Sequence, residues 1–258
     1  MSISISQKTV TRIITGTKKY SKVLADASKA DINESDTVLI IRDMLEGIFG
    51  YDRYSEITTE YAIRNTYCDV AVKIDGKPRY LIEVKAINIK LNENHLRQAT
   101  EYCTQSDLEY VILTNGQCWK IFKIVYKRPI KIEQIFEINW IEESAKDKGF
   151  IEKVFCLCKE GISKTALTQY EEAKQATNKF MLAAIVLGDQ VLKCIKKEIK
   201  QINGFNVDID DLKTIIREEL LKREVIENEE ASSAAKRYKN IQSKPIKQKE
   251  PEGKTPEV

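Results

Sequence analysis

Two opposite charges lie inside an otherwise apolar stretch, the segment YLIEVKA at residues 80–86. Side chains alternate between the two faces of a strand, so Glu83 and Lys85 point to the same side. Ionised groups in the centre of a strand cost several kcal/mol unless they are paired or bound to something. A solvent-facing pair on an edge strand, worth about 0–1 kcal/mol, is the structural alternative to a functional site.

A second acid, Asp69, precedes this segment on a strand that leads into an Asp75-Gly76 turn. A two-residue turn in a regular hairpin places Asp69 opposite Ile82, on the wrong face. An odd loop, such as residues 74–76 with the glycine in a bulge, places Asp69 on the face of Glu83. Chemistry that uses both acids therefore requires an odd loop or a bulge in this hairpin.

Two carboxylates and a backbone carbonyl that meet within a few ångströms form a hard-oxygen site suited to Mg²⁺ or Mn²⁺. A lysine beside them can orient or deprotonate an attacking water and offset the charge of an attacked phosphate. These groups together suit phosphodiester hydrolysis. Gln98 and Tyr102 lie four residues apart on the following predicted helix, so they share one face and could contact a phosphate.

The elements that must position these residues form a mixed α/β pattern. Val38, Ile41, Leu45 and Ile48 step by three and four, which predicts an amphipathic helix capped by Asn33 or Ser35. Two strands in 56–74, broken near Asn65, precede the strand 80–86. A helix at 92–105, a strand at 108–114 and a hairpin formed by 118–126 and 130–138 follow.

The chain is expected to divide into four parts: a lead-in at 1–30, an α/β core at 31–140, a helical region at 141–230 and a tail at 231–258. The helical region includes one long helix, or two meeting near Gly188, and a further helix capped by Asp208 or Asp210. The tail holds seven Lys or Arg against three Glu and few apolar residues. This composition predicts a disordered basic tail that could contact phosphates without sequence preference.

Composition excludes several functional classes. The net charge of +3 is too small to indicate nucleic acid binding by itself. No apolar run is long enough for a membrane span and the first residues lack a secretory signal, so we expect a cytoplasmic protein without membrane contact. The six cysteines form no CxxC pair and there is one histidine, which argues against a Cys/His zinc site. No GxxxxGK(S/T) motif occurs, so we expect no ATPase motor in this chain.

Together, these motifs resemble those of a known family. Asp69, then Glu83-Val84-Lys85, then the Gln98 to Tyr102 spacing resemble the PD-(D/E)xK nuclease superfamily in its form with a QxxxY helix. More narrowly, the stretches 33–52, 59–86, 95–103 and 110–122 resemble the amino-terminal nuclease domain of type I restriction enzyme R subunits, in its stand-alone bacterial form. The resemblance is dense over 31–140 and implies a restriction-endonuclease-like core.

The resemblance also implies an activity and a site. It implies a Mg²⁺-dependent DNA endonuclease, with Mn²⁺ as the alternative ion, in which Asp69, Glu83 and the Val84 carbonyl hold the metal. Lys85 would serve the attacking water. Gln98 and Tyr102 would support the active centre.

Two positions qualify this resemblance. Glu34 matches an additional acid that many superfamily members carry on the first helix, although the helix dipole alone favours an acid in a first turn. Cys68 stands where the superfamily's name has proline, a position without chemistry of its own.

The partners follow from this function. We expect DNA as the substrate in restriction or antiviral defence, a protein partner for targeting or activation, and self-association through the helical region. Two alternatives stay open: a non-catalytic nucleic-acid-binding or assembly subunit that keeps the fold, and a nuclease that is active only with its partner.

Overall fold

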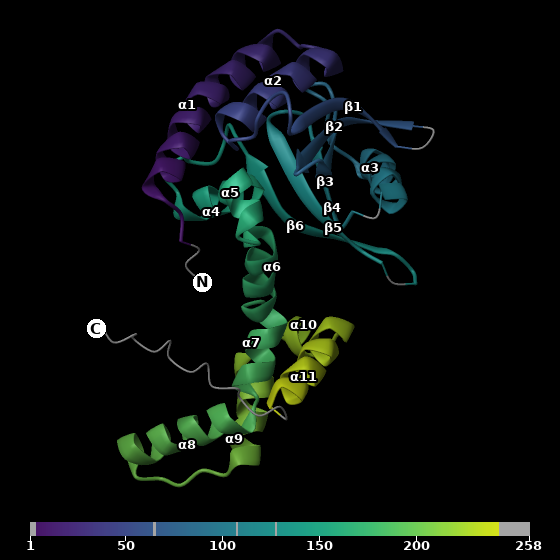
Figure 1. Ribbon diagram of the computed structural model, residues 1–258. Coiled ribbons are helices and arrows are strands. Elements are labelled where there is room, and N and C mark those ends of the chain that lie inside the picture. The colour runs from purple at the N-terminus through teal and green to yellow at the C-terminus, as the bar shows by residue number, and fades with distance from the viewer. Residues whose placement is uncertain (1–3, 64–65, 107, 127, 243–258) are drawn as a thin grey trace, which may run out of the picture. The chain divides into compact units, whose positions relative to one another are not determined.

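The computed structural model describes residues 4–63, 66–106, 108–126 and 128–242. The chain forms two compact units, Met1–Glu171 and Glu172–Val258. The first unit combines a sheet with helices (Figure 1). Its strands are β1 (Ile57–Ile63), β2 (Thr66–Ile74), β3 (Lys77–Val84), β4 (Tyr110–Thr114), β5 (Cys118–Val125) and β6 (Lys131–Asn139). Its helices are α1 (Gln7–Lys29), α2 (Glu34–Gly47), α3 (Glu93–Ser106), α4 (Lys148–Leu157) and α5 (Lys159–Ser163), and α6 (Ala166–Ala176) begins in it.

The six strands form one sheet in the order β1-β2-β3-β4-β5-β6. All neighbouring pairs are antiparallel except β3 and β4, which are parallel. Parallel neighbours need a crossover connection, and α3 supplies it. The predicted mixed α/β core is therefore confirmed, including the helix between its third and fourth strands.

Both faces of the sheet are covered by helices. On β3, Ile82 and Val84 belong to the larger apolar cluster, with residues of α1, α2 and α4, whereas Leu81 belongs to a second cluster with Ala99 and Cys103 of α3. This alternation is the period-two pattern of a strand buried on both sides. Glu83 follows Leu81 on the α3 face and is only 1% exposed, so it is a charged residue in a fully covered part of the sheet.

Helix α2 begins where the sequence pattern predicts. Asn33 caps it, because its side-chain oxygen accepts a hydrogen bond from the Asp36 N–H at 3.0 Å. Glu34 is therefore the first helical residue, in the turn where the helix dipole favours an acid. The cap fixes the start of α2 and with it the position of the Glu34 carboxylate.

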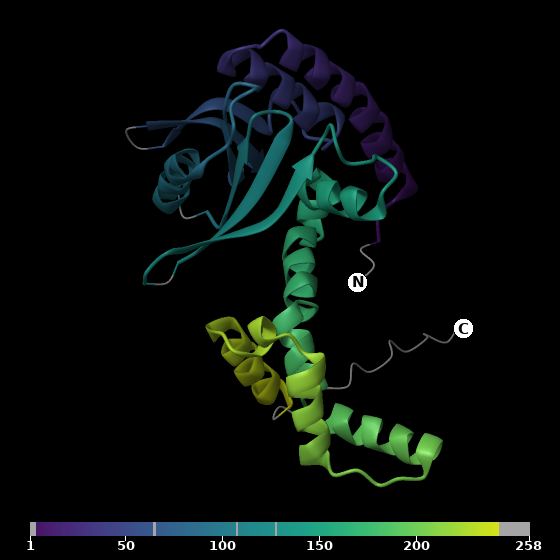
Figure 2. The same cartoon turned by 180° about the vertical axis from the view of Figure 1, so that it is seen from behind.

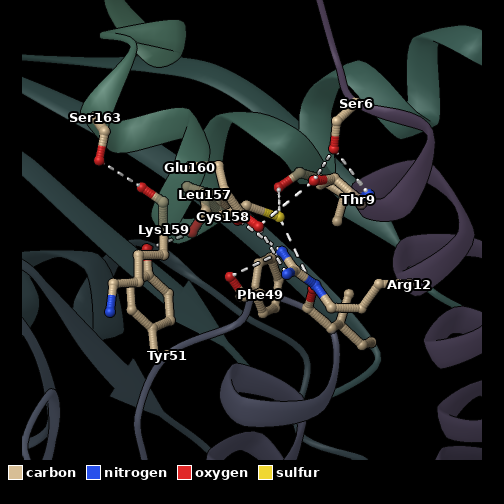
Figure 3. A network of polar contacts seen from close by, with 12 residues as sticks. Ser6, Thr9, Arg12, Phe49, Tyr51, Leu157, Cys158, Lys159, Glu160 and Ser163 are labelled. Atoms are coloured by element: carbon tan, nitrogen blue, oxygen red, sulfur yellow. Dashed lines mark hydrogen bonds and ion pairs between the residues drawn. The ribbon is translucent and has the colours of Figure 1, made fainter.

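Helix α1, which occupies most of the predicted lead-in, is an integral part of the first unit. Ile13 and Leu24 are fully buried in the larger cluster. A polar network holds the helix in place (Figure 3): the Arg12 guanidinium binds both carboxylate oxygens of Glu160 at 2.7 Å, and its Nε donates to the Ile48 carbonyl at 2.9 Å. Two-point binding of this kind fixes geometry as well as charge, so Arg12 joins α1 to the end of α2 and to α5.

The second unit is helical. It contains α7 (Lys179–Val186), α8 (Asp189–Asn203), α9 (Ile209–Ile215), the π-helical turn η1 (Ile216–Leu220), α10 (Arg223–Ile226) and α11 (Glu229–Gln242). Of the two alternatives, one long helix or two that meet near Gly188, the structure shows the break, and Gly188 is the N-cap of α8. A second break was not foreseen: Asn178 caps α7 and separates it from α6. Asp208, one of the two predicted caps, begins α9.

The carboxyl-terminal segment differs from the sequence expectation. We expected disorder from residue 231, but α11 runs through Glu229–Gln242, with Ala231 and Ala234 buried. Its small residues face a neighbouring helix while its many charges face solvent, a pattern that composition alone does not separate from a disordered segment. Residues 243–258 lie outside the described part of the chain.

Candidate active site

The β2–β3 hairpin brings Asp69 and Glu83 to the same face. Its turn has two residues, Asp75 and Gly76, both with positive φ (53° and 73°), as the tight turn of a two-residue hairpin needs. Val70 pairs with Ile82, so in this register Asp69 lies opposite Glu83. Asp69 and Glu83 therefore lie on the same face, as the site requires, and a bulge rather than an odd loop places them there.

The bulge lies at Arg79. Val72 pairs with Tyr80 whereas Lys73 pairs with Pro78, which leaves Arg79 as the extra residue on β3. Sequence reasoning left the bulge as one of two options and did not place it. Pro78 was the available signal, because a proline inside a sheet strand is tolerated chiefly at edges and bulges.

The two carboxylates have different contacts. Oδ2 of Asp69 accepts a hydrogen bond from the Val84 N–H at 2.6 Å, and Oε1 of Glu83 accepts one from Lys85 Nζ at 2.6 Å. The other oxygen of Glu83, Oε2, is buried and has no hydrogen-bond partner among the described residues. A buried unpaired carboxylate oxygen is rare in folded proteins, so the site has capacity for a further positive or donating group.

Lys85 lies directly after β3, where its backbone N–H donates to the Thr114 carbonyl of β4 at 2.8 Å. Its ammonium group contacts Glu83 and also lies 3.6 Å from Oε2 of Glu34 on α2. The lysine side chain is 14% exposed, so one edge of the site reaches solvent. The β3–β4 pairing, with Thr114 fully buried, was not recognised from sequence as a support of this lysine.

Burial dominates the electrostatics of the site. Burial, helped by the charge of Asp69, raises the pKa of Glu83 to about 7 against the opposing effect of Lys85. Burial also raises the pKa of Asp69, which the Val84 hydrogen bond and the Lys85 charge partly offset. Burial lowers the pKa of Lys85, but the hydrogen bond and charge of Glu83 outweigh it, so this pKa lies above its ordinary value. Perturbed titrations of this kind cluster at functional sites.

The QxxxY positions are only partly placed. Gln98 lies on α3 with an exposed side chain, and α3 packs on the sheet face that carries Glu83. The Tyr102 side chain lies outside the described residues. Cys68 is buried, and its thiol donates to the Ile82 carbonyl at 3.3 Å, so it has a packing role beside Asp69.

The donor set fits a divalent cation with oxygen ligands. Asp69 and Glu83 are adjacent carboxylates, the orphaned Oε2 of Glu83 is available, and the Val84 carbonyl belongs to the same strand segment. Among the described residues, no group of three or more His, Cys, Asp or Glu side chains is close enough to hold a metal. The Glu34 carboxylate contacts Lys85 and forms no such group with Asp69 and Glu83. Its role as a metal ligand stays a prediction.

The comparisons with known proteins bear on this same region. Residues 47–138 match the family model described as type I restriction enzyme R protein N terminus (HSDR_N). Searches of curated proteins and of solved structures gave no match. No helix in the described part of the chain is long and apolar enough to cross a membrane. The segment 47–138, which carries Asp69, Glu83 and Lys85, therefore matches the type I restriction enzyme R protein N-terminal family, as the motifs indicated.

Proposed function

We propose that this chain is a metal-dependent DNA nuclease that hydrolyses phosphodiester bonds in restriction or a related defence process. The observation that carries the proposal is the juxtaposition of Asp69, Glu83 and Lys85 on one buried sheet face within the matched segment. A solvent-facing ion pair, the structural alternative, would not leave a glutamate 1% exposed with an unpaired oxygen.

Asp69, Glu83 and the Val84 carbonyl would hold Mg²⁺ or Mn²⁺, with Glu34 as a further candidate ligand. When bound, the ion supplies positive charge to the attacked phosphate and promotes ionisation of the attacking water. It would also offset the burial cost of the two carboxylates more fully than one lysine can. The family match supports DNA as the substrate class.

The protein's own groups would position the reactants. Glu83 and Glu34 hold the Lys85 ammonium at the open edge of the site, where it can orient the attacking water or donate to a phosphate oxygen. The Val84 N–H fixes one oxygen of Asp69 and thereby the direction of its carboxylate. Gln98 and Tyr102 are proposed to contact the phosphate from α3.

Cleavage of plasmid DNA by the purified protein tests the proposal. We expect cleavage with Mg²⁺ or Mn²⁺, none with EDTA, and a loss of about 10²–10⁴-fold in Lys85→Ala, Asp69→Asn and Glu83→Gln. Lys123→Ala is a matched control, because Lys123 also pairs with a glutamate, Glu171, at 2.9 Å. In the sheet, Lys123 lies opposite Tyr110, at the end of β4 that is remote from Thr114 and the site. Loss of the Lys123 ammonium should therefore spare cleavage.

A second readout does not depend on turnover. Saturating Mg²⁺ or Mn²⁺ should stabilise the wild type by about 2.7 kcal/mol at a hundred times its dissociation constant, and should not stabilise Asp69→Asn. Equal behaviour of wild type and all three variants in both assays would contradict the catalytic proposal. Tight, metal-independent DNA binding would then favour the non-catalytic subunit. Cleavage that appears only after a partner protein is added would favour the partner-activated nuclease.

A further inference from the structure

Helix α8 carries a stripe of lysines along one side. Lys196 and Lys197 each lie three or four residues from both Lys193 and Lys200, so the four lysines lie on one side of the helix. Lys193, Lys197 and Lys200 are exposed and Lys196 is half-buried. We call these four residues the α8 lysine stripe. In the second unit, α8 packs against α9, and Figure 2 shows the two helices joined by a loop.

The charge of the stripe is not neutralised by acids among the residues that the structure describes. None of the four lysines forms an ion pair with an acid in the described part of the chain. Asp189 lies one turn before Lys193 without pairing with it, and Glu198 has no lysine three or four residues away. The lysines instead neighbour one another, an arrangement that destabilises an isolated helix. A surface that retains such repulsion can recover free energy when it binds an anion.

The apolar side of α8 packs against other residues of its own unit. Leu192 is fully buried, and Ile195 and Ile199 pack against the same small cluster, which includes Leu212 and Ile216 from α9 and η1. A helix that lies on a membrane surface must insert its apolar face among the lipids. Since α8 turns that face to its own unit, a membrane surface is disfavoured as the partner of the stripe.

We propose that the α8 lysine stripe binds the phosphate backbone of duplex DNA without sequence preference. This inference rests on the proposed function only for the choice of DNA as the polyanion. Lys200 lies seven positions after Lys193 along the helix, a rise of about 10 Å. Duplex DNA presents one negative charge per about 1.7 Å of axis, so several phosphates lie within reach of four flexible side chains. Lysine suits such contacts because it acts as a point charge on a long stem.

Fluorescence anisotropy with labelled duplexes of unrelated sequence tests this inference, with the full chain in EDTA so that binding is measured apart from cleavage. Each phosphate contact contributes about 0.9 to the slope of log affinity against log salt concentration. The double variant Lys193→Gln/Lys197→Gln should therefore reduce the magnitude of the slope by about 1.8. It should weaken binding to every duplex by a similar factor.

A matched control removes the same charge from another helix. Lys18→Gln/Lys22→Gln deletes two exposed lysines at the same spacing on α1. It should leave the affinity and the salt slope at their wild-type values. Among the described residues the α8 variant loses repulsion but no ion pair, so its thermal midpoint should equal or exceed that of the wild type. A folding defect would therefore be seen directly.

The outcomes separate this inference from the nuclease proposal. A reduced slope in the α8 variant alone supports the stripe, even if the wild type never cuts DNA. An unchanged slope, or an equal loss in the α1 control, overturns the stripe even if cleavage is robust. Binding to anionic phospholipid vesicles without binding to DNA overturns it as well.

Discussion

Glu83 has an environment that is costly for a carboxylate. It is 1% exposed, one of its oxygens is unpaired among the described residues, and Asp69 lies opposite it. The lysine that contacts it does not restore its ordinary titration, since its pKa is still raised to about 7. This carboxylate therefore adds unfavourable free energy to the folded protein, as groups at ligand-binding sites commonly do.

Replacing this carboxylate should stabilise the metal-free protein. The folded state holds the Glu83 proton more tightly than the unfolded state, whose value is near 4.5, so the penalty is absent below about pH 4.5 and complete above about pH 7. We expect Glu83→Gln to raise the free energy of unfolding by about 1–3 kcal/mol at pH 8 and by little at pH 4.5. Urea unfolding in EDTA at both pH values measures this.

Glu34→Gln serves as the control for this measurement. Glu34 also contacts Lys85, but its side chain is 48% exposed, so its replacement should change stability by no more than about 0.5 kcal/mol at either pH. A Glu83→Gln protein that is less stable than the wild type at pH 8 would contradict the account of the buried charge.

The residue types and spacing predicted that Glu83 and Lys85 lie together, but not how the side chains around them contact one another. Alternation along β3 placed Glu83 and Lys85 together, and an odd loop or a bulge in the hairpin would add Asp69 to their face. The contact between Lys85 and Glu34 depends on how α2 lies across the end of β3, which is a long-range packing result. The depth of burial of Glu83 was also invisible, because it follows from α3 covering that face.

At the scale of elements, the β2–β3 hairpin contains one residue more than its pairing needs. Arg79 is that residue: the pairs on either side of it, Val72 with Tyr80 and Lys73 with Pro78, would meet without it. The sequence predicted that some irregularity was necessary. It did not locate the irregularity, because an odd turn and a bulge satisfy parity equally well and only the packing of the strand distinguishes them.

Two single-residue deletions in this hairpin should therefore differ sharply. Deletion of Arg79 removes the bulge and keeps Asp69 opposite Glu83, so we expect stability within about 1 kcal/mol of the wild type and retained stabilisation by Mg²⁺. Deletion of Asp75 removes a residue that the two-residue turn requires at positive φ, which forces a new register. The Asp75 deletion should lose both the near-wild-type stability and the stabilisation by Mg²⁺. Thermal unfolding with and without metal compares them, and equal damage would refute the bulge assignment.

At the scale of the whole molecule, the two units have unequal cores. The first contains two large apolar clusters, whereas the buried part of the second unit's α8–α9 cluster consists, among the described residues, of Leu192, Leu212 and Ile216, of which only Leu192 is fully buried. We expect amides of α8 and α9 to exchange with solvent at least about 10²-fold faster than those of β2 to β4. Hydrogen exchange with mass spectrometry measures this, and similar protection in both units would contradict it.

The boundary between the units shows that helical periodicity in the sequence does not tell which core a helix joins. The sequence placed the end of the α/β core near Trp140, because the residues beyond it have helical periodicity. The first compact unit instead extends to Glu171, since Phe150 and Phe155 of α4 enter the larger cluster. The periodicity of α4 resembles that of the later helices, and it does not specify which core a helix will join.

The link between Arg12 and Glu160 has a consequence for the time course of synthesis. The two residues lie 148 positions apart, and translation proceeds at about 5–20 residues per second. Roughly 7–30 seconds therefore pass between the emergence of Arg12 from the ribosome and the emergence of its ionic partner. During that interval α2 can cover part of α1, but α4 and α5 are not yet present. The nascent chain thus carries a helix whose apolar face is incompletely covered until the last part of its first unit is made.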